Sequence, residues 1–138
     1  MPPQHLVRRG RREMTADLYL ALAMATLAAH LLFNLWVVFG AAATRGRPKL
    51  TGLHIGSVLY GTVMENVPWS CPLTLAENLF KAHAGLEPYE EPFVAHYLQA
   101  AVSPNFPIRM LRWGAIAVGL VNVGVYTRRY AHAHHKAI

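Results

Sequence analysis

The chain has 138 residues, of which 54% are hydrophobic and 14% charged, and its mean hydropathy is +0.23. It is too short for two soluble domains and too apolar for an ordinary one, so a membrane protein is the first hypothesis. The formal charge of +6 would suit nucleic acid, but Lys and Arg gather at the ends of apolar runs. We therefore expect the lipid bilayer with its anionic headgroups as the partner, and no nucleic acid.

A first transmembrane helix is predicted over residues of about 17–43. The apolar run from Leu18 to Ala43 exceeds the roughly 20 residues that a helix needs to cross a bilayer, and only three polar residues interrupt it: Thr26, His30 and Asn34. The Arg-rich leader, residues 1–13, is expected to be disordered, or untranslated if synthesis begins at Met14. The leader and the run together resemble a signal peptide, but the run exceeds the usual apolar region of roughly 7–15 residues, which favours a retained helix.

Two further spans are predicted, over residues of about 51–67 and 108–127. The later one is apolar between arginines near its ends, which can extend their charge towards the interface. The earlier one is weaker, since it holds five polar residues: His54, Ser57, Thr62, Glu65 and Asn66. An amphipathic helix on the membrane surface is the alternative for residues 51–67. With three spans, residues 14–129 form a single membrane domain, and the fold class is an all-α integral membrane protein.

Two short interfacial cap helices are predicted between the second and third spans, over residues of about 75–84 and 92–102. Thr74 and Glu77 match the capping box that begins a helix, and Pro92 suits the first helical position. At about ten residues each, neither helix can cross a bilayer. The His-rich tail, residues 130–138, is expected to be flexible.

The Lys and Arg residues also predict the orientation. Six of them lie in residues 44–50 and in the tail from residue 128, and short loops rich in Lys and Arg stay in the cytoplasm. We expect an outside N-terminus and a cytoplasmic C-terminus. The Arg-rich leader opposes this orientation unless translation starts at Met14.

Three segments carry a family resemblance: "HLLFNLWVVFG", "LHIGSVLYGTVMENVPWSCPLTLAENL" and "PFVAHYL" followed by proline. They resemble a family of small bacterial membrane proteins known as domain of unknown function 2784, and the W-x-CPLT-x-x-EN block is the most specific part. The resemblance runs from about His30 to Tyr126 and implies a membrane location, which we expect to be the inner membrane of a bacterium, without an activity. The positions carried over are His30, His54, Glu65, Cys71, Pro72, Thr74, Glu77, Asn78, His96 and Tyr97.

Polar residues inside the predicted spans fall into two layers. At about 1.5 Å per residue, His30 and Glu65 lie about 18 and 21 Å from the loop between the first two spans, near the depth of Arg112. Asn34 extends the stripe from His30, and a shallower layer groups His54 with Asn122. An unpaired carboxylate at this depth would cost roughly 3 kcal/mol or more. The structural interpretation is therefore that Glu65 pairs with Arg112 or His30.

The functional interpretation is a metal or heme site. His30, Glu65 and His96 would hold iron, copper or heme for electron transfer or oxidation. The sequence has no phosphate loop, H-E-x-x-H motif or nucleophile elbow. The leading hypothesis is accordingly a noncatalytic accessory or structural subunit that packs in a larger membrane complex or a homo-oligomer.

Overall fold

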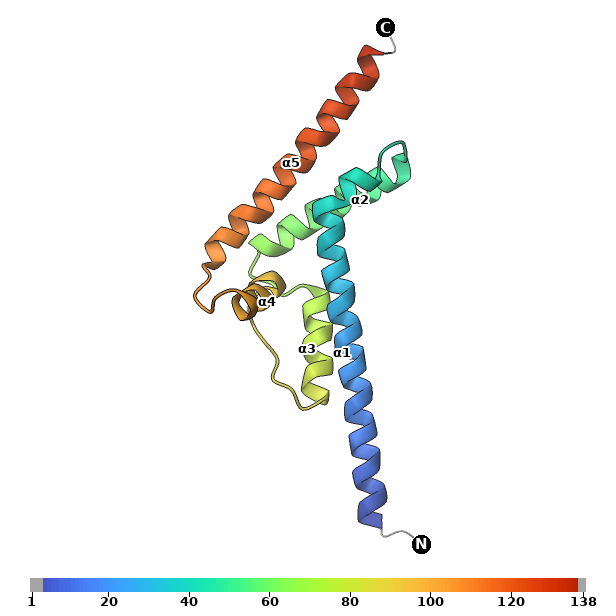
Figure 1. Ribbon diagram of the computed structural model, residues 1–138, viewed down its shortest axis with the longest axis vertical. Helices are drawn as coiled ribbons and strands as arrows, with labels where there is room; N and C mark the ends of the chain where they lie inside the picture. The colour runs from blue at the N-terminus through green and yellow to red at the C-terminus, as the bar shows by residue number, and fades with distance from the viewer. Residues whose placement is uncertain (1–3, 137–138) are drawn as a thin grey trace. The chain divides into compact units, whose positions relative to one another are not determined.

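A computed structural model describes residues 4–136, and every regular element in that range is an α-helix (Figure 1). The helices are α1 (Gln4–Ala43), α2 (Pro48–Asn66), α3 (Pro72–His83), α4 (Phe93–Ala101) and α5 (Ile108–His135). The prediction of an all-α fold is thus confirmed for the described chain.

The turn between α1 and α2 is built from local signals. Gly46 has a φ of +73°, a conformation that glycine adopts without steric cost. Pro48 then opens α2, where its missing N–H is not needed. The Thr51 hydroxyl closes the turn by donating to the carbonyls of Thr44 at 3.3 Å and Arg47 at 3.1 Å.

The end of α2 and both ends of α3 are set by proline and glycine. Val67 is extended because the residue before a proline avoids the helical region. Pro72 is the first residue of α3. At the far end, Gly85 has a φ of +80°, and the backbone bonds Gly85 to Ala82 and Leu86 to Lys81 make the two-bond motif that commonly ends helices.

The predicted capping box is wrong, although the prediction of two short helices is close. Because α3 begins at Pro72 with Cys71 as its N-cap, Thr74 lies inside the first turn and Glu77 lies beyond it. Pro72 at the first position outweighs the box as the signal for the helix start. The second short helix, α4, lies within the predicted range of 92–102.

Both long helices run further than predicted. From Gln4 the leader is helical rather than disordered, and its Arg9 side chain pairs with Glu13 at 3.1 Å one turn away. At the other end, α5 continues to His135, so residues 130–135 are helical rather than flexible. No proline interrupts either helix, and Ala and Arg favour helical backbone. Residues 1–3 and 137–138 lie outside the described range.

Two of the described helices, α1 and α5, are long and apolar enough to cross a membrane. Helix α2, which covers most of the predicted third span over 51–67, fails the same test of length and hydropathy, so a third span is not shown. The cause is the composition of α2, which has 19 residues and places Lys49, His54, Glu65 and Asn66 among its apolar side chains.

The described chain divides into two compact units. The first contains α1 as far as Leu31 together with residues 70–93, and in it Tyr19 lies 4.7 Å from His83, ring to ring. The second contains the rest of α1, α2, most of α4 and α5. Helices α2 and α5 approach closely at Gly119, where an added Cβ would lie 3.4 Å from the Thr62 hydroxyl.

Candidate functional site

The second unit is centred on His54, which is 0% exposed. We call four side chains the His54 cluster: His54, Tyr126 and Thr44, which hydrogen bonds link in that order, and Asn122, which shares the Val37 carbonyl with His54. His54 Nε2 lies 3.0 Å from the carbonyl oxygen of Trp36 and 3.3 Å from that of Val37. Its other nitrogen, Nδ1, lies 2.7 Å from the Tyr126 hydroxyl.

The partners of His54 decide where its proton lies. Nε2 faces two carbonyl oxygens, which only accept, so this nitrogen is the donor. In the neutral ring Nδ1 then accepts from the Tyr126 hydroxyl. The Tyr126 oxygen also lies 3.0 Å from the Thr44 hydroxyl, which lies 3.0 Å from the carbonyl of Ala41. The cluster thus links α2 and α5 to the last two turns of α1.

Two further contacts strengthen the same junction. Asn122 on α5 donates to the Val37 carbonyl at 3.4 Å and to Val118 at 2.9 Å. Arg129 donates to the Ala41 carbonyl at 2.7 Å. Each of these two side chains donates across to a backbone carbonyl of α1, so both tie α5 to α1. The His54 cluster therefore holds three helices together: α1, α2 and α5.

The first unit contains a second buried polar group, Glu77, which is also 0% exposed. We call Glu77, Asn78, Lys81 and Tyr89 the Glu77 cluster. The Tyr89 hydroxyl donates to Glu77 Oε2 at 2.9 Å, and Lys81 Nζ lies 3.1 Å from Oε1. The Lys81 ammonium also lies 4.6 Å from the centre of the Tyr89 ring. A buried carboxylate is stable only when paired in this way.

Asn78 completes the Glu77 cluster by holding the segment that carries Tyr89. Its amide nitrogen donates to the Tyr89 carbonyl at 2.6 Å, and its oxygen accepts from the Tyr89 N–H at 3.2 Å. The side chain thereby replaces a backbone partner for an irregular segment. In the same unit His30 is 5% exposed and its ring stacks on Phe93 at 3.8 Å. The Glu77 carboxylate is close enough to act electrostatically on His30.

The residues predicted as metal ligands fall in different units. His30 belongs to the first unit, while Glu65 and His96 belong to the second. Among residues 4–136, no group of three or more His, Cys, Asp or Glu residues is placed to hold a metal ion. His96 lies 5.0 Å from Tyr97, ring to ring, in α4. The three-residue metal site therefore stays a prediction.

The shallower of the two predicted polar layers grouped His54 with Asn122. In the structure both side chains contact the carbonyl oxygen of Val37. Glu65 and Arg112 lie within electrostatic range but form no ion pair in the described chain. Burial raises the pKa of the Glu65 carboxyl, and the Arg112 guanidinium offsets part of that rise. The pairing of Glu65 with Arg112 or His30 stays a prediction.

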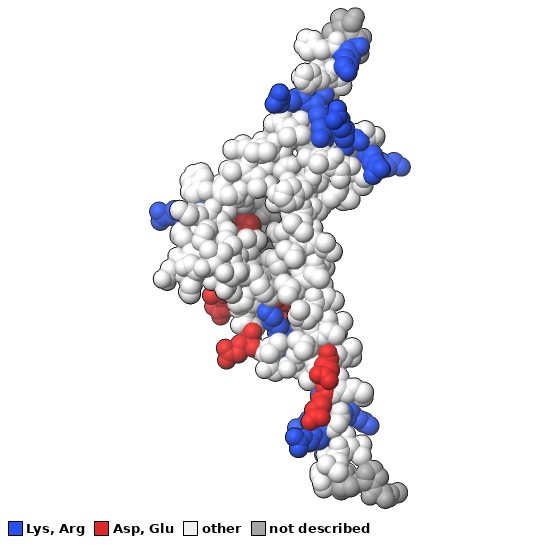
Figure 2. Space-filling view, viewed as in Figure 1, with Lys and Arg blue, Asp and Glu red and all other residues white. Residues whose placement is uncertain are grey.

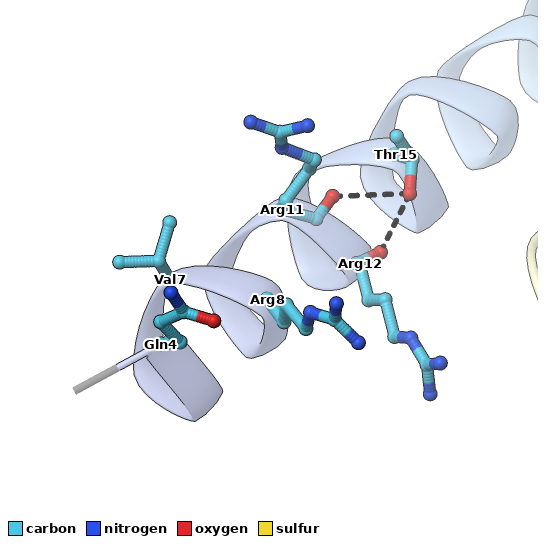
Figure 3. A pocket seen from close by; sticks show the side chains of 6 residues that line it. All are labelled: Gln4, Val7, Arg8, Arg11, Arg12 and Thr15. Carbon is cyan, nitrogen blue, oxygen red and sulfur yellow. Dashed lines mark hydrogen bonds between the residues drawn. The ribbon is translucent and has the colours of Figure 1, made fainter.

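A hollow lies beside the first turns of α1, and Figure 3 shows the six side chains that line it, all from this one helix. The Thr15 hydroxyl there donates to the carbonyls of Arg11 and Arg12, at 3.1 and 2.9 Å. All six of these residues are exposed to solvent: Gln4, Val7, Arg8, Arg11, Arg12 and Thr15. The hollow is an open surface feature of a single helix, without the buried polar groups of a binding pocket.

Residues 20–127 match a family model described as "Protein of Unknown function (DUF2784)". The chain belongs to this family. The matched range includes both clusters in full, from Thr44 to Tyr126, together with His30, whereas Arg129 lies beyond its end. No curated protein and no solved structure matches the chain.

In this DUF2784 member, sequence reasoning grouped His54 with Asn122 but assigned Glu77 to a capping box, and it missed the other partners of both residues. Tyr126 lies one turn after Asn122 on α5, and this spacing is the signal that could have placed it beside His54. Lys81 lies one turn after Glu77 on α3, a spacing at which opposite charges pair. Tyr89 carried no such signal, because it follows α3 in an irregular segment.

Proposed function

We propose that the chain is an integral membrane protein whose helices α1 and α5 cross the bilayer in the same direction, with α2 returning the chain across it between them. The observation that carries this proposal is the exposure of their apolar surfaces. In the most apolar stretch of 18 residues in each helix, only 11% of α1 and 6% of α5 is buried within the chain. An apolar core helix of a soluble protein would be mostly buried, and a signal sequence would account for α1 alone, because α5 lies far from the N-terminus.

The positions of Lys and Arg residues in the second unit support the placement of one membrane boundary. We call five of them the basic band: Arg45, Arg47, Lys49, Arg128 and Arg129. The bonds from Tyr126 to Thr44 and from Arg129 to Ala41 put the end of α5 level with the α1–α2 turn. Arg128 lies 20 positions after Ile108, a rise of about 30 Å, which equals the hydrocarbon thickness of a bilayer. By the positive-inside rule the basic band faces the cytoplasm of a bacterial inner membrane.

Within the membrane, the proposed role is that of a noncatalytic accessory or structural subunit. The His54 and Glu77 clusters support this role, because the hydrogen bonds and the ion pair of their buried polar atoms join parts of the same unit. Large apolar side chains on both long helices are exposed, among them Leu32, Phe39, Trp113 and Leu120. Lipid covers such a surface in a monomer, and a larger subunit or a second copy covers it in a complex.

Two measurements test the proposal. Membranes washed with alkaline carbonate should retain the chain, whereas release into the supernatant would overturn the membrane assignment. After extraction in mild detergent, the protein mass determined by light scattering should exceed the 15.3 kDa of one chain by a fixed amount. A mass equal to one chain across detergents and concentrations would overturn the subunit role while leaving the membrane assignment intact.

A further inference from the structure

The two units have opposite charge balance. The first holds five Lys or Arg residues and six Asp or Glu residues, while the second holds eight Lys or Arg residues and a single acidic residue, Glu65. The whole positive charge of the chain therefore comes from the second unit. Within that unit Arg109 and Arg112 begin α5, and five of the remaining cations form the basic band.

The basic band is exposed and lacks acidic neighbours. Arg45, Arg47, Lys49 and Arg128 are solvent-exposed, and none of the four forms an ion pair or a side-chain hydrogen bond within residues 4–136. Figure 2 shows Lys and Arg side chains gathered around the α1–α2 turn and the last turns of α5. Since like charges repel, this grouping costs free energy unless an anion of another molecule neutralises it.

We propose that the basic band binds the headgroup of an anionic phospholipid, and this inference rests on the proposed membrane function. The band lies where the apolar parts of α1 and α5 end, which is the depth of lipid phosphates. Guanidinium groups pair with phosphate oxygens through two parallel hydrogen bonds, and three of the four unpaired cations are arginines. Each Lys or Arg near an anionic surface contributes about 1 kcal/mol of attraction.

Arg129 has a different task in the same band. Its guanidinium donates to the Ala41 carbonyl and lies 5.8 Å from the centre of the Tyr126 ring. Substituting it would disturb the helix junction as well as the charge. The test therefore changes Arg45, Arg47 and Arg128, which are exposed and make no side-chain contact of this kind, and leaves Arg129 in place.

The experiment measures which lipid surrounds the protein. The chain, with Trp69→Phe and Trp113→Phe so that Trp36 is the sole reporter, is reconstituted in phosphatidylcholine vesicles. A small fraction of the lipid is brominated phosphatidylglycerol in one sample and brominated phosphatidylcholine in the other. Bromine quenches tryptophan fluorescence on contact, so the ratio of quenching gives the lipid preference. We expect at least about a fivefold preference for phosphatidylglycerol, which corresponds to one cation worth about 1 kcal/mol.

Two variants with the same loss of charge decide the outcome. Arg45→Gln/Arg47→Gln/Arg128→Gln should reduce the preference to near one, while the control Arg8→Gln/Arg9→Gln/Arg11→Gln should keep it. Equal quenching by both lipids in the parent, a preference that survives in the first variant, or an equal loss in both variants would overturn the inference. Quenching by neither lipid would mean that α1 does not enter the bilayer and would overturn the membrane function itself. Circular dichroism confirms that both variants remain helical.

Discussion

Replacing Gly40 with alanine tests whether the His54 cluster holds the second unit together. A Cβ at this position would collide with the His54 ring, with Nε2 at 2.7 Å, and would lie 3.1 Å from Trp36. The His54 ring cannot retreat without cost, because it is 0% exposed and both of its nitrogens are hydrogen-bonded. Gly40→Ala must therefore displace the ring and break its bonds to α1 and α5.

The expected cost follows from three terms. Overpacking a filled interior costs about 1–3 kcal/mol, and each lost hydrogen bond adds about 0.5–1.5 kcal/mol. The higher helix preference of alanine returns about 0.5–1 kcal/mol. With one bond lost to α1 and one to α5, we expect a net destabilisation of about 1–5.5 kcal/mol. Gly56→Ala is the matched control, because no heavy atom lies within 4 Å of its added Cβ, so it should be neutral or stabilising by up to about 1 kcal/mol.

The assay is unfolding by sodium dodecyl sulfate titrated into protein in a mild detergent, followed by far-ultraviolet circular dichroism. Gly40→Ala should unfold at a clearly lower fraction of the denaturing detergent than the parent, and Gly56→Ala should not. If both variants unfold with the parent, the close contact between α1 and the His54 ring is not a source of stability and the reasoning fails.

Three other expectations are open to measurement. Tyr89→Phe removes the hydroxyl that donates to the buried Glu77 carboxylate and should cost about 1.5–3 kcal/mol in the same unfolding assay; an unchanged midpoint would count against that bond. Because burial raises the pKa of Glu65 in the folded chain, its carboxyl favours folding fully below the unfolded pKa, and this contribution is lost as pH rises through the folded pKa. Glu65→Gln should flatten that part of the stability profile, and an identical profile would refute the assignment. In cells carrying a chain without its native cysteine, a cysteine at Glu90 should react with an impermeant thiol reagent and one at Lys49 should not; the reverse pattern would invert the proposed orientation.

The sequence predicted the helices well because their signals are local. Apolar runs mark α1 and α5, and Pro48, Gly85 and Pro92 lie close to observed helix ends. Signals that compete at short range were harder to weigh. Thr74 and Glu77 fit a capping box as well as Pro72 fits a first helical position, and nothing in the local pattern decides between them.

The partners of the buried polar residues depend on contacts that are distant in sequence. His54 meets Trp36 across 18 residues and Tyr126 across 72. Counting depth along ideal helices placed His54 near Asn122, and in the structure both contact the same part of α1. It could not reveal Tyr89, whose place beside Glu77 depends on an irregular segment held by Asn78.

The His54 contacts also determine an order of assembly. The bond from His54 to Trp36 joins two neighbouring helices and can form as soon as α2 has been made. Tyr126 is translated 72 residues later, which at about 5–20 residues per second is a delay of roughly 4–14 s. During that interval Nδ1 of His54 has no partner from α5. The side of the α1–α2 hairpin that α5 will cover still presents this polar group. Arrival of α5 satisfies that nitrogen, so the last helix to emerge from the ribosome is the one that locks the first two.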